Sequence, residues 1–200
     1  MPPGLVALHT NPLFHSRKGT LNQYDELTMS RFFIDKNPGV FKDILEFSGF
    51  DDVISFKKYG IGKYHFGKTT GVDTLKDKNL TICGTPNQPE WLYKLFAATI
   101  GWLGWQNLLD ENKTTAMRYR PVKHNGKLFW FMTFDDEFLR HVQRWFIESE
   151  LEQSSGRSRL SRTEATVNVF SHFPLLQANQ KKLPEHIINK YKKNKEKYNV

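Results

Sequence analysis

A run of arginines in the last third of the chain has the clearest capacity for chemistry. Residues 153–162 read QSSGRSRLSR and carry Arg157, Arg159 and Arg162. A guanidinium group stays charged at ordinary pH, and its forked donors match the oxygens of a phosphate. Such a cluster can stabilise the charge on a γ-phosphoryl group during transfer. Gly156 allows a tight turn beside the first arginine, and the Gln153 amide can orient a water molecule or sense a nucleotide. The run therefore indicates phosphate chemistry, with a solvated basic loop as the alternative.

A second segment with phosphate-binding residue types lies in the first half of the chain. Residues 66–73 read FGKTTGVD and supply Lys68, the hydroxyls of Thr69 and Thr70, a flexible Gly71 and the carboxylate of Asp73. An apolar stretch at 79–84 follows it and predicts a buried strand that ends at Thr85-Pro86. The segment is therefore expected to form a loop that leads into a strand.

The two segments together resemble two motifs of superfamily 2 helicases. Gln153-x-x-Gly156-Arg157-x-Arg159 resembles motif VI, the arginine-finger motif, and residues 66–73 with the strand after them resemble motif V. The family places its second motif VI arginine where this chain has Leu160, so Arg159 or Arg162 would take that role. The resemblance covers about residues 53–173. These residues resemble the C-terminal, second RecA-like lobe of a DNA helicase of the plasmid, phage or mobile-element type.

The resemblance implies a role for each motif residue. In the family, motif VI reaches into the cleft between two lobes, and motif V touches both the nucleotide and the nucleic-acid backbone. Arg157, Arg159 and Gln153 would then act on the ATP phosphates, Gly156, Gly71, Asp73, Lys68 and Thr69 would bind the nucleotide, and Thr70 would contact the strand. No acidic box follows an apolar strand in this chain. ATP and Mg²⁺ would therefore be bound jointly with a first RecA-like lobe, in cis or in trans, and the chain alone would be an incomplete ATP hydrolase.

A competing interpretation uses some of the same residues. Gly62 to Thr69 formally satisfy the P-loop pattern, in which Lys68 would meet the β- and γ-phosphates and Thr69 would bind magnesium. A P-loop should follow a buried strand and open a substantial helix, but little chain separates Thr69 from the strand at 79–84. The bulky Tyr64-His65-Phe66 also suits a phosphate-wrapping loop poorly. The motif V interpretation is favoured, and a self-sufficient P-loop ATPase remains an alternative.

The pattern of apolar residues predicts how these segments are positioned. Strands alternate with helices, so we expect a RecA-like three-layer α/β domain with a mainly parallel sheet. The predicted elements are two short helices in 25–50 broken at Asn37-Pro38-Gly39, strands at 53–56, 79–84 and 165–170, a mostly buried helix over 91–109, and a helix over 138–153 begun by the acidic residues 135–137. We divide the chain into an entry segment (1–24), the lobe (25–178) and a basic tail (179–200).

A hairpin and the tail supply candidate contacts to a nucleic-acid backbone. Residues 116–133 predict two strands around His124-Asn125-Gly126, a strong turn signal, inserted into the lobe. The hairpin carries Arg118, Arg120, Lys123 and Lys127, and only one face of its aromatic run 128–132 can be buried, which leaves one or two rings to stack on bases. The last twenty residues hold seven lysines and two glutamates, which predicts a frayed basic helix that is either solvated or in contact with phosphate.

The composition limits the classes of function. Two hundred residues with 38% hydrophobic content fit one domain, and 29 basic against 21 acidic residues give a net charge of +8, which favours DNA or RNA as partner. Cys83 is the single cysteine and the seven histidines are scattered, so we expect no disulfide and no metal site. No apolar run is long enough to span a bilayer, so a cytoplasmic protein without a membrane partner is expected. The alternative function is a non-enzymatic DNA- or RNA-binding protein.

Overall fold

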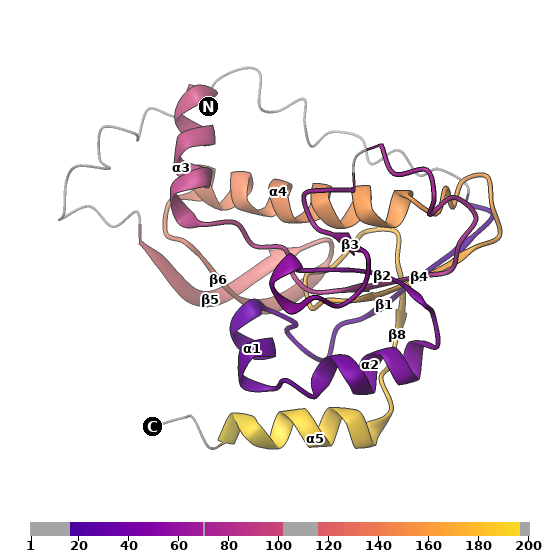
Figure 1. The fold of residues 1–200 in the computed structure, drawn as a ribbon. Coiled ribbons are helices and arrows are strands. Elements are labelled where there is room, and N and C mark those ends of the chain that lie inside the picture. The colour runs from indigo at the N-terminus through magenta and orange to yellow at the C-terminus, as the bar shows by residue number, and fades with distance from the viewer. Residues whose placement is uncertain (1–16, 70, 102–115, 197–200) are drawn as a thin grey trace.

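The computed structural model describes residues 17–69, 71–101 and 116–196, and it is a three-layer α/β fold consistent with a RecA-like domain (Figure 1). A six-stranded parallel sheet has the order β3-β2-β4-β7-β1-β8, and β5 and β6 form a separate antiparallel pair. The strands are β1 (Thr20–Tyr24), β2 (Asp52–Ser55), β3 (Tyr64–His65), β4 (Leu80–Cys83), β5 (Met117–His124), β6 (Lys127–Phe134), β7 (Thr166–Phe170) and β8 (Asn179–Lys181). The helices are α1 (Arg31–Lys36), α2 (Val40–Ser48), α3 (Glu90–Thr99), α4 (Glu137–Gly156) and α5 (Glu185–Glu196), with a 3-10 turn at Lys57–Tyr59.

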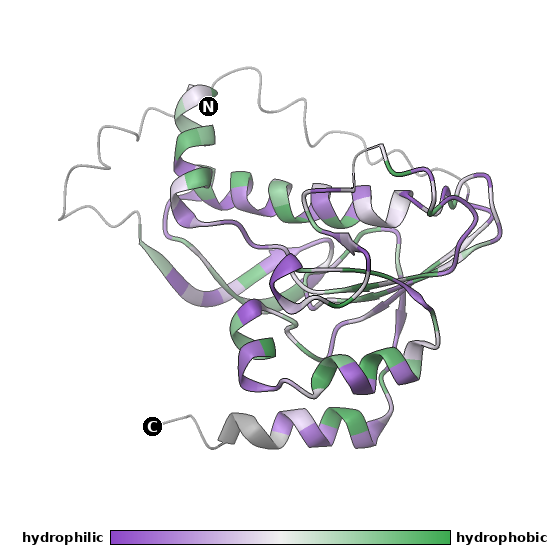
Figure 2. Cartoon of the chain, viewed as in Figure 1, coloured by the Kyte–Doolittle hydropathy of each residue, from purple (hydrophilic) through white to green (hydrophobic). Residues whose placement is uncertain are grey.

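The helices cover the two faces of the sheet unequally. Helices α1, α2 and α5 lie on one face, and α4 lies on the other with the hairpin and α3 beside it (Figure 1). Each face has its own apolar core, built around Ile34, Ile44 and Phe170 on the first side and around Ile82, Ile147 and Val167 on the second. Within each helix the colour changes between hydrophobic green and hydrophilic purple (Figure 2). This is the pattern of helices that bury one side only.

Strand β1 lies inside the sheet, between β7 and β8, although the sequence assigned residues 1–24 to an entry segment. The strand was missed because its sequence, TLNQY, is polar. Gln23 is fully buried, and its amide donates to the carbonyls of Ser171 at 2.9 Å and Phe173 at 2.7 Å while its oxygen accepts from the Leu175 amide at 2.9 Å. A buried polar side chain that makes all these bonds is tolerated in a core, so hydrogen bonding replaces apolar packing at this position.

Local chemistry explains where the predicted helices begin and end. The Ser30 hydroxyl accepts from the Phe33 amide at 3.1 Å and caps α1, and the break at 37–39 separates α1 from α2 as predicted. Helix α2 ends at Gly49, whose φ of 68° is a left-handed conformation that favours glycine. The Asp136 carboxylate accepts from the Leu139 amide at 2.8 Å and caps α4. The helix expected over 138–153 is confirmed.

The hairpin insertion is also confirmed. Asn125 and Gly126 have φ values of 46° and 77°, as a two-residue turn of this kind requires. The Asn125 amide donates to Glu148 Oε1 on α4 at 2.6 Å and to the Pro174 carbonyl at 3.0 Å, and His124 Nε2 lies 3.1 Å from Glu148 Oε2. The tip of the hairpin is therefore fastened to α4 and to the segment after β7.

Two expectations about burial were wrong. Helix α3 is not mostly buried: Tyr93 and Ala97 face the core, but Trp91 is 63% and Leu95 55% exposed. The part of the predicted helix beyond residue 101 lies outside the described residues up to 115. The basic tail is not a loose helix in its described part, because Ile187 and Tyr191 of α5 are buried against the α2 side of the sheet. In the described ranges, no helix is long and apolar enough to cross a membrane.

Candidate phosphate-binding loops

The two segments singled out in the sequence form loops at the same edge of the sheet. Residues 66–79, the β3–β4 loop, lead into β4, and residues 157–165, the α4–β7 loop, lead into β7. Strands β4 and β7 are parallel neighbours with Leu80 paired to Val167, so their amino ends lie side by side. The topology therefore brings together two segments that are about half the chain apart.

Side chains and backbone of the two loops contact one another directly. Arg159 donates from its guanidinium to the Asp73 carboxylate at 2.6 Å, and the Asp77 amide lies 3.4 Å from the Ser158 carbonyl. Beneath these contacts Leu75 and Leu160 are both buried in one apolar cluster. The residues that resemble motif V and motif VI thus form one continuous surface.

Helix α4 also reaches the β3–β4 loop. The Glu150 carboxylate accepts from the Gly67 amide at 2.8 Å. The sequence did not single out Glu150, and one acidic residue on a helix gave no signal that it would fix a loop far away in the chain. The contact holds the first turn of the β3–β4 loop against the last turns of α4.

Arg159 has a strained backbone. Its φ is +55°, a left-handed conformation that costs a non-glycine residue about 1–2 kcal/mol. The Arg159 carbonyl accepts from the amides of Arg162 at 2.7 Å and Thr163 at 3.1 Å, so the tight turn that follows holds the conformation in place. Residues held in such conformations are concentrated at ligand-binding sites. The strain fixes the direction in which the guanidinium leaves the loop.

Several buried polar atoms in and beside these loops have no hydrogen-bond partner among the described residues. They are His65 Nδ1, Thr69 Oγ1, Ser154 Oγ, Arg157 Nε and Ser158 Oγ. Buried polar groups normally find a partner, and each exception needs an explanation such as a bound ligand or ion. Hydroxyl and guanidinium groups can donate to phosphate oxygens. Ser154, in the last turn of α4, and Ser158, two residues beyond its end, were not predicted.

The end of α4 shapes the electrostatics of the arginine run. The carbonyl end of a helix carries about half a negative charge, which favours cations nearby. Gly156 is the last residue of α4 and Arg157 is its C-cap, so Arg157 lies at this negative end and Arg159 follows two residues later. Gln153, one turn earlier, is exposed on the same helix. The arrangement stabilises the guanidinium groups, and among the described residues no carboxylate pairs with Arg157.

The β3–β4 loop does not have the geometry of a P-loop. Strand β3 interrupts the 62–69 pattern at Tyr64–His65, and the described residues between Thr69 and β4 form turns rather than a helix. The Thr69 side chain is fully buried and Lys68 is exposed. Gly71 has a φ of 75°, a conformation that suits glycine, and Thr70 lies outside the described residues. A P-loop ATPase that uses Lys68 and Thr69 would need a helix that this fold does not provide at that point.

The basic residues of the hairpin are partly neutralised within the chain. Arg118 and Arg120 both pair with Asp135, the former through Nε at 3.2 Å, and Lys127 pairs with Asp25. Lys123 is exposed. The hairpin packs against the segment after β7, at the opposite end of the strands from the two loops. The structure does not bring the predicted strand-binding residues of the hairpin together with the predicted nucleotide-binding residues.

One face of the hairpin is open, as the alternation predicted. Phe129 and Phe131 are buried, whereas Trp130 is exposed. Its indole stacks on the ring of Tyr119 with centroids 5.6 Å apart and an angle of 24° between the planes. Tyr119 was not predicted, and its cross-strand position beside Trp130 is the signal that would have found it. The pair provides a flat aromatic surface of the kind on which bases stack.

Neither a metal-binding cluster nor a similar known protein assigns a function to these loops. In the described part of the chain, no group of three or more His, Cys, Asp or Glu side chains could hold a metal ion. No family model matches the chain, and no curated protein or solved structure matches it.

Proposed function

We propose that the chain is the second lobe of an ATP-dependent helicase or translocase acting on DNA or RNA. The observation that carries the proposal is the contact between Arg159 and Asp73, which joins the two segments that resemble motifs VI and V. Arg157 and Ser158, which precede Arg159 in the chain, carry buried donor groups with no partner among the described residues, and such groups can donate to the phosphate oxygens of a nucleotide.

The paired loops suggest how the arginines would work. The Asp73 side chain is 80% exposed and that of Arg159 38% exposed, so their ion pair is worth only about 0.2–1 kcal/mol. Arg159 can therefore exchange Asp73 for a phosphate at little cost. Arg157, whose Nε is buried and unpartnered, would donate to the same anion from the end of α4. Gln153 on the exposed side of α4 would face the attacking water.

Bound Mg²⁺ would neutralise phosphate charge, and its ligands belong to the first lobe in this proposal. The β3–β4 loop carries two carboxylates near the arginines, Asp73 and Asp77, and Asp73 is engaged by Arg159. The chain's own residues would bind and orient the phosphates and so complete a site that a first RecA-like lobe opens. The aromatic pair and Lys123 on the hairpin would hold the strand.

The test is a titration of the purified chain with ATP and Mg²⁺, followed by backbone amide NMR shifts. We expect shifts in residues 66–79 and 150–163, and at least a tenfold loss of affinity in Arg157→Ala and in Arg159→Ala. Lys76→Ala is the matched control, because Lys76 is an exposed cation in the same loop system. The absence of shifts in these two segments, or equal affinities in all three variants, would refute the proposal.

A second measurement separates the proposal from a binding protein without nucleotide chemistry. Fluorescence anisotropy with a labelled single strand gives the strand affinity with and without ATP and Mg²⁺. The helicase lobe requires that nucleotide changes the affinity, and that Arg157→Ala removes the change. A strand affinity that is the same with and without nucleotide would favour the non-enzymatic nucleic-acid-binding protein.

A further inference from the structure

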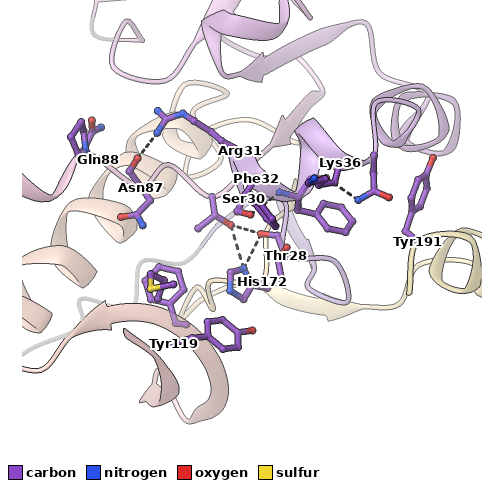
Figure 3. Close-up of a pocket in the computed structure, with 16 residues that line it drawn as sticks. Thr28, Ser30, Arg31, Phe32, Lys36, Asn87, Gln88, Tyr119, His172 and Tyr191 are labelled. Carbon is purple, nitrogen blue, oxygen red and sulfur yellow. Dashed lines mark hydrogen bonds between the residues drawn. The ribbon is translucent and has the colours of Figure 1, made fainter. Parts of the chain in front are cut away.

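A pocket of about 970 Å³ lies at the carboxyl ends of β1, β4 and β7. Its walls come from the segment after β1 with α1, from residues 85–89 after β4, and from the hairpin, and His172 after β7 forms part of its floor (Figure 3). Pockets that bind small molecules and cofactors typically have volumes of about 300–1,000 Å³. This volume is large enough for a nucleotide or a ligand of similar size.

The pocket occupies the place where the topology of the sheet reverses. The chain leaves β1 toward α1 and α2 on one face, and leaves β4 toward α3 and α4 on the other (Figure 1). The helices that follow β1 and β4 therefore lie on opposite faces of the sheet, and the pocket lies between them at its carboxyl edge. In open α/β sheets, ligands bind in a crevice at this position, outside the carboxyl ends of the strands.

The pocket is separate from the two phosphate-binding loops. Those loops enter the amino ends of β4 and β7, whereas the pocket lies at their carboxyl ends. A strand rises about 3.3 Å per residue, so the four residues of β4 place roughly 13 Å of sheet between the pocket and the ends of the loops that enter β4 and β7. The start of the β3–β4 loop lies nearer, because the Phe66 ring packs against Phe56, over whose ring Arg31 lies. No residue belongs to both sites.

The charged residues of the pocket are all basic. Arg31 and Lys36 line it, and its sixteen lining residues include no aspartate or glutamate. Three acidic residues lie close to the lining, and each is engaged by other groups. Glu90 pairs with Lys94, and Asp43 accepts from Lys190 and from the Tyr191 hydroxyl. Asp35, next to Lys36 in sequence, is engaged by Lys58 at 2.8 Å and by the Tyr59 hydroxyl at 3.0 Å. These hydrogen bonds, that from Lys58 above all, lower the pKa of Asp35. The Asp35 carboxylate therefore stays charged and bound to Lys58 and Tyr59 outside the pocket. The pocket is suited to an anion.

Arg31 is held in position without being neutralised. Its Nη1 donates to the Asn87 carbonyl at 2.6 Å, and its guanidinium lies over the ring of Phe56 with Cζ 4.6 Å from the centroid. Among the described residues it has no carboxylate partner. Figure 3 shows Arg31 reaching across to Asn87 at one side of the pocket. The full positive charge thus remains available on a fixed group.

Aromatic rings line the same pocket and are unusually exposed. Phe32 is 73% exposed and Tyr119 is 53% exposed, and both line the pocket together with Phe131. Lys36 Nζ lies 5.8 Å from the centroid of the Phe32 ring. A large apolar side chain left in solvent beside a cation is informative, because most such rings are buried. The rings offer stacking surfaces for a flat ligand.

The polar floor of the pocket is rigid. His172 Nδ1 lies 2.9 Å from the Thr28 carbonyl, and the Thr85 hydroxyl donates to the same carbonyl at 2.8 Å (Figure 3). The imidazole also packs against the ring of Phe131, with centroids 5.6 Å apart. The loops after all three strands are therefore tied together, and a ligand would enter a largely preformed site.

We propose that this pocket binds one nucleotide unit, with its phosphate on Arg31 and Lys36 and its base on the rings of Phe32 and Tyr119. The unit is either a free nucleotide or a single residue of a nucleic-acid strand, since both present an anion attached to a flat ring. The proposal shares no residue with the phosphate-binding loops, although Tyr119 also belongs to the aromatic pair of the hairpin. The variants Arg31→Ala and Arg157→Ala therefore distinguish the pocket from the nucleotide site of the helicase-lobe function.

The test compares the affinities of the full chain for three probes by isothermal titration calorimetry. The probes are adenosine monophosphate, adenosine, and a short single-stranded oligodeoxyadenylate. Arg31→Ala and Phe32→Ala remove the proposed contacts, and both side chains are exposed, so the fold is expected to survive. Lys42→Ala, an exposed lysine of α2, and Trp91→Ala, an exposed ring of α3, are the matched controls.

We expect the phosphate-bearing probes to bind at least tenfold more tightly than adenosine, and to lose at least tenfold in Arg31→Ala and in Phe32→Ala but not in the controls or in Arg157→Ala. Binding of the monophosphate identifies a free nucleotide, and binding of the oligonucleotide alone identifies a strand. The proposal is overturned if neither probe binds, if adenosine binds equally well, or if the pocket variants keep full affinity. Loss in Arg157→Ala alone would place the ligand in the phosphate-binding loops instead.

Discussion

Replacement of Arg159 by glycine and by alanine separates backbone strain from side-chain function. Arg159 has a φ of +55°, and a left-handed conformation costs an alanine there about 1–2 kcal/mol, as it costs the arginine. Glycine adopts this conformation without strain, but it lowers the free energy of unfolding by about 0.4–1 kcal/mol because the unfolded chain gains conformational freedom. Both variants lose the same exposed ion pair to Asp73. The glycine variant should therefore be more stable than the alanine variant by roughly 0.5–1 kcal/mol.

The assay is thermal unfolding of the wild type and both variants in one buffer. For a chain of this size, 1 kcal/mol shifts Tm by about 2–4 °C, so we expect Arg159→Gly to unfold about 1–4 °C above Arg159→Ala. ATP binding should be equally impaired in both, because both lack the guanidinium. Equal Tm values, or a higher Tm for the alanine variant, would show that the loop relaxes and that the conformation at this residue is not enforced by its surroundings.

Other substitutions test packing, pH dependence and the hairpin surface. A Cβ on Gly19 would lie 2.5 Å from the Ala165 carbonyl, so Gly19→Ala should lose about 1–3 kcal/mol in denaturant unfolding, whereas Gly156→Ala meets nothing and should lose none. The Lys190 ammonium, with the Tyr191 hydroxyl, lowers the pKa of Asp43. Because the folded pKa is below the unfolded value near 3.9, the stabilisation is present above that pH and is lost as pH falls through the folded pKa. The Tm difference between wild type and Asp43→Asn should thus be largest at neutral pH and vanish in acid. Trp130→Ala should weaken strand binding by about 1–3 kcal/mol per stacked base in anisotropy titrations, with little change in Tm.

Elements with a strong local signal were predictable from the sequence. The break between α1 and α2, the Asn125-Gly126 turn and the buried strands β4 and β7 each follow from local residue chemistry. Strand β1 was not predictable, because Gln23 is recognisable as a core residue only when the carbonyls that it bonds are in place. The exposure of α3 likewise depends on which elements lie beside it, which an apolar run such as Trp91–Ile100 does not reveal.

The candidate sites divide in the same way. Residue types and spacing singled out Arg157, Arg159 and Asp73, but their meeting depends on β4 and β7 being neighbours, which is a property of the sheet order. The pocket at the carboxyl ends was not predicted, since Arg31 and Phe32 belong to a short helix with no recognisable motif. Non-local pairing, rather than local pattern, decides where such side chains converge.

Helix α4 connects the end of the hairpin to the start of the arginine run. Its twenty residues span about 30 Å, beginning at the Asp136 cap beside β6 and ending at Arg157. Glu148 accepts a hydrogen bond from Asn125 at the hairpin tip, and Glu150 accepts one from the Gly67 amide of the β3–β4 loop. Both neighbouring segments are therefore attached to the same helix. The two attachment points, Glu148 and Glu150, are only two residues apart, so the hairpin tip and the β3–β4 loop are fixed to the same stretch of α4, within about two turns of the arginine run.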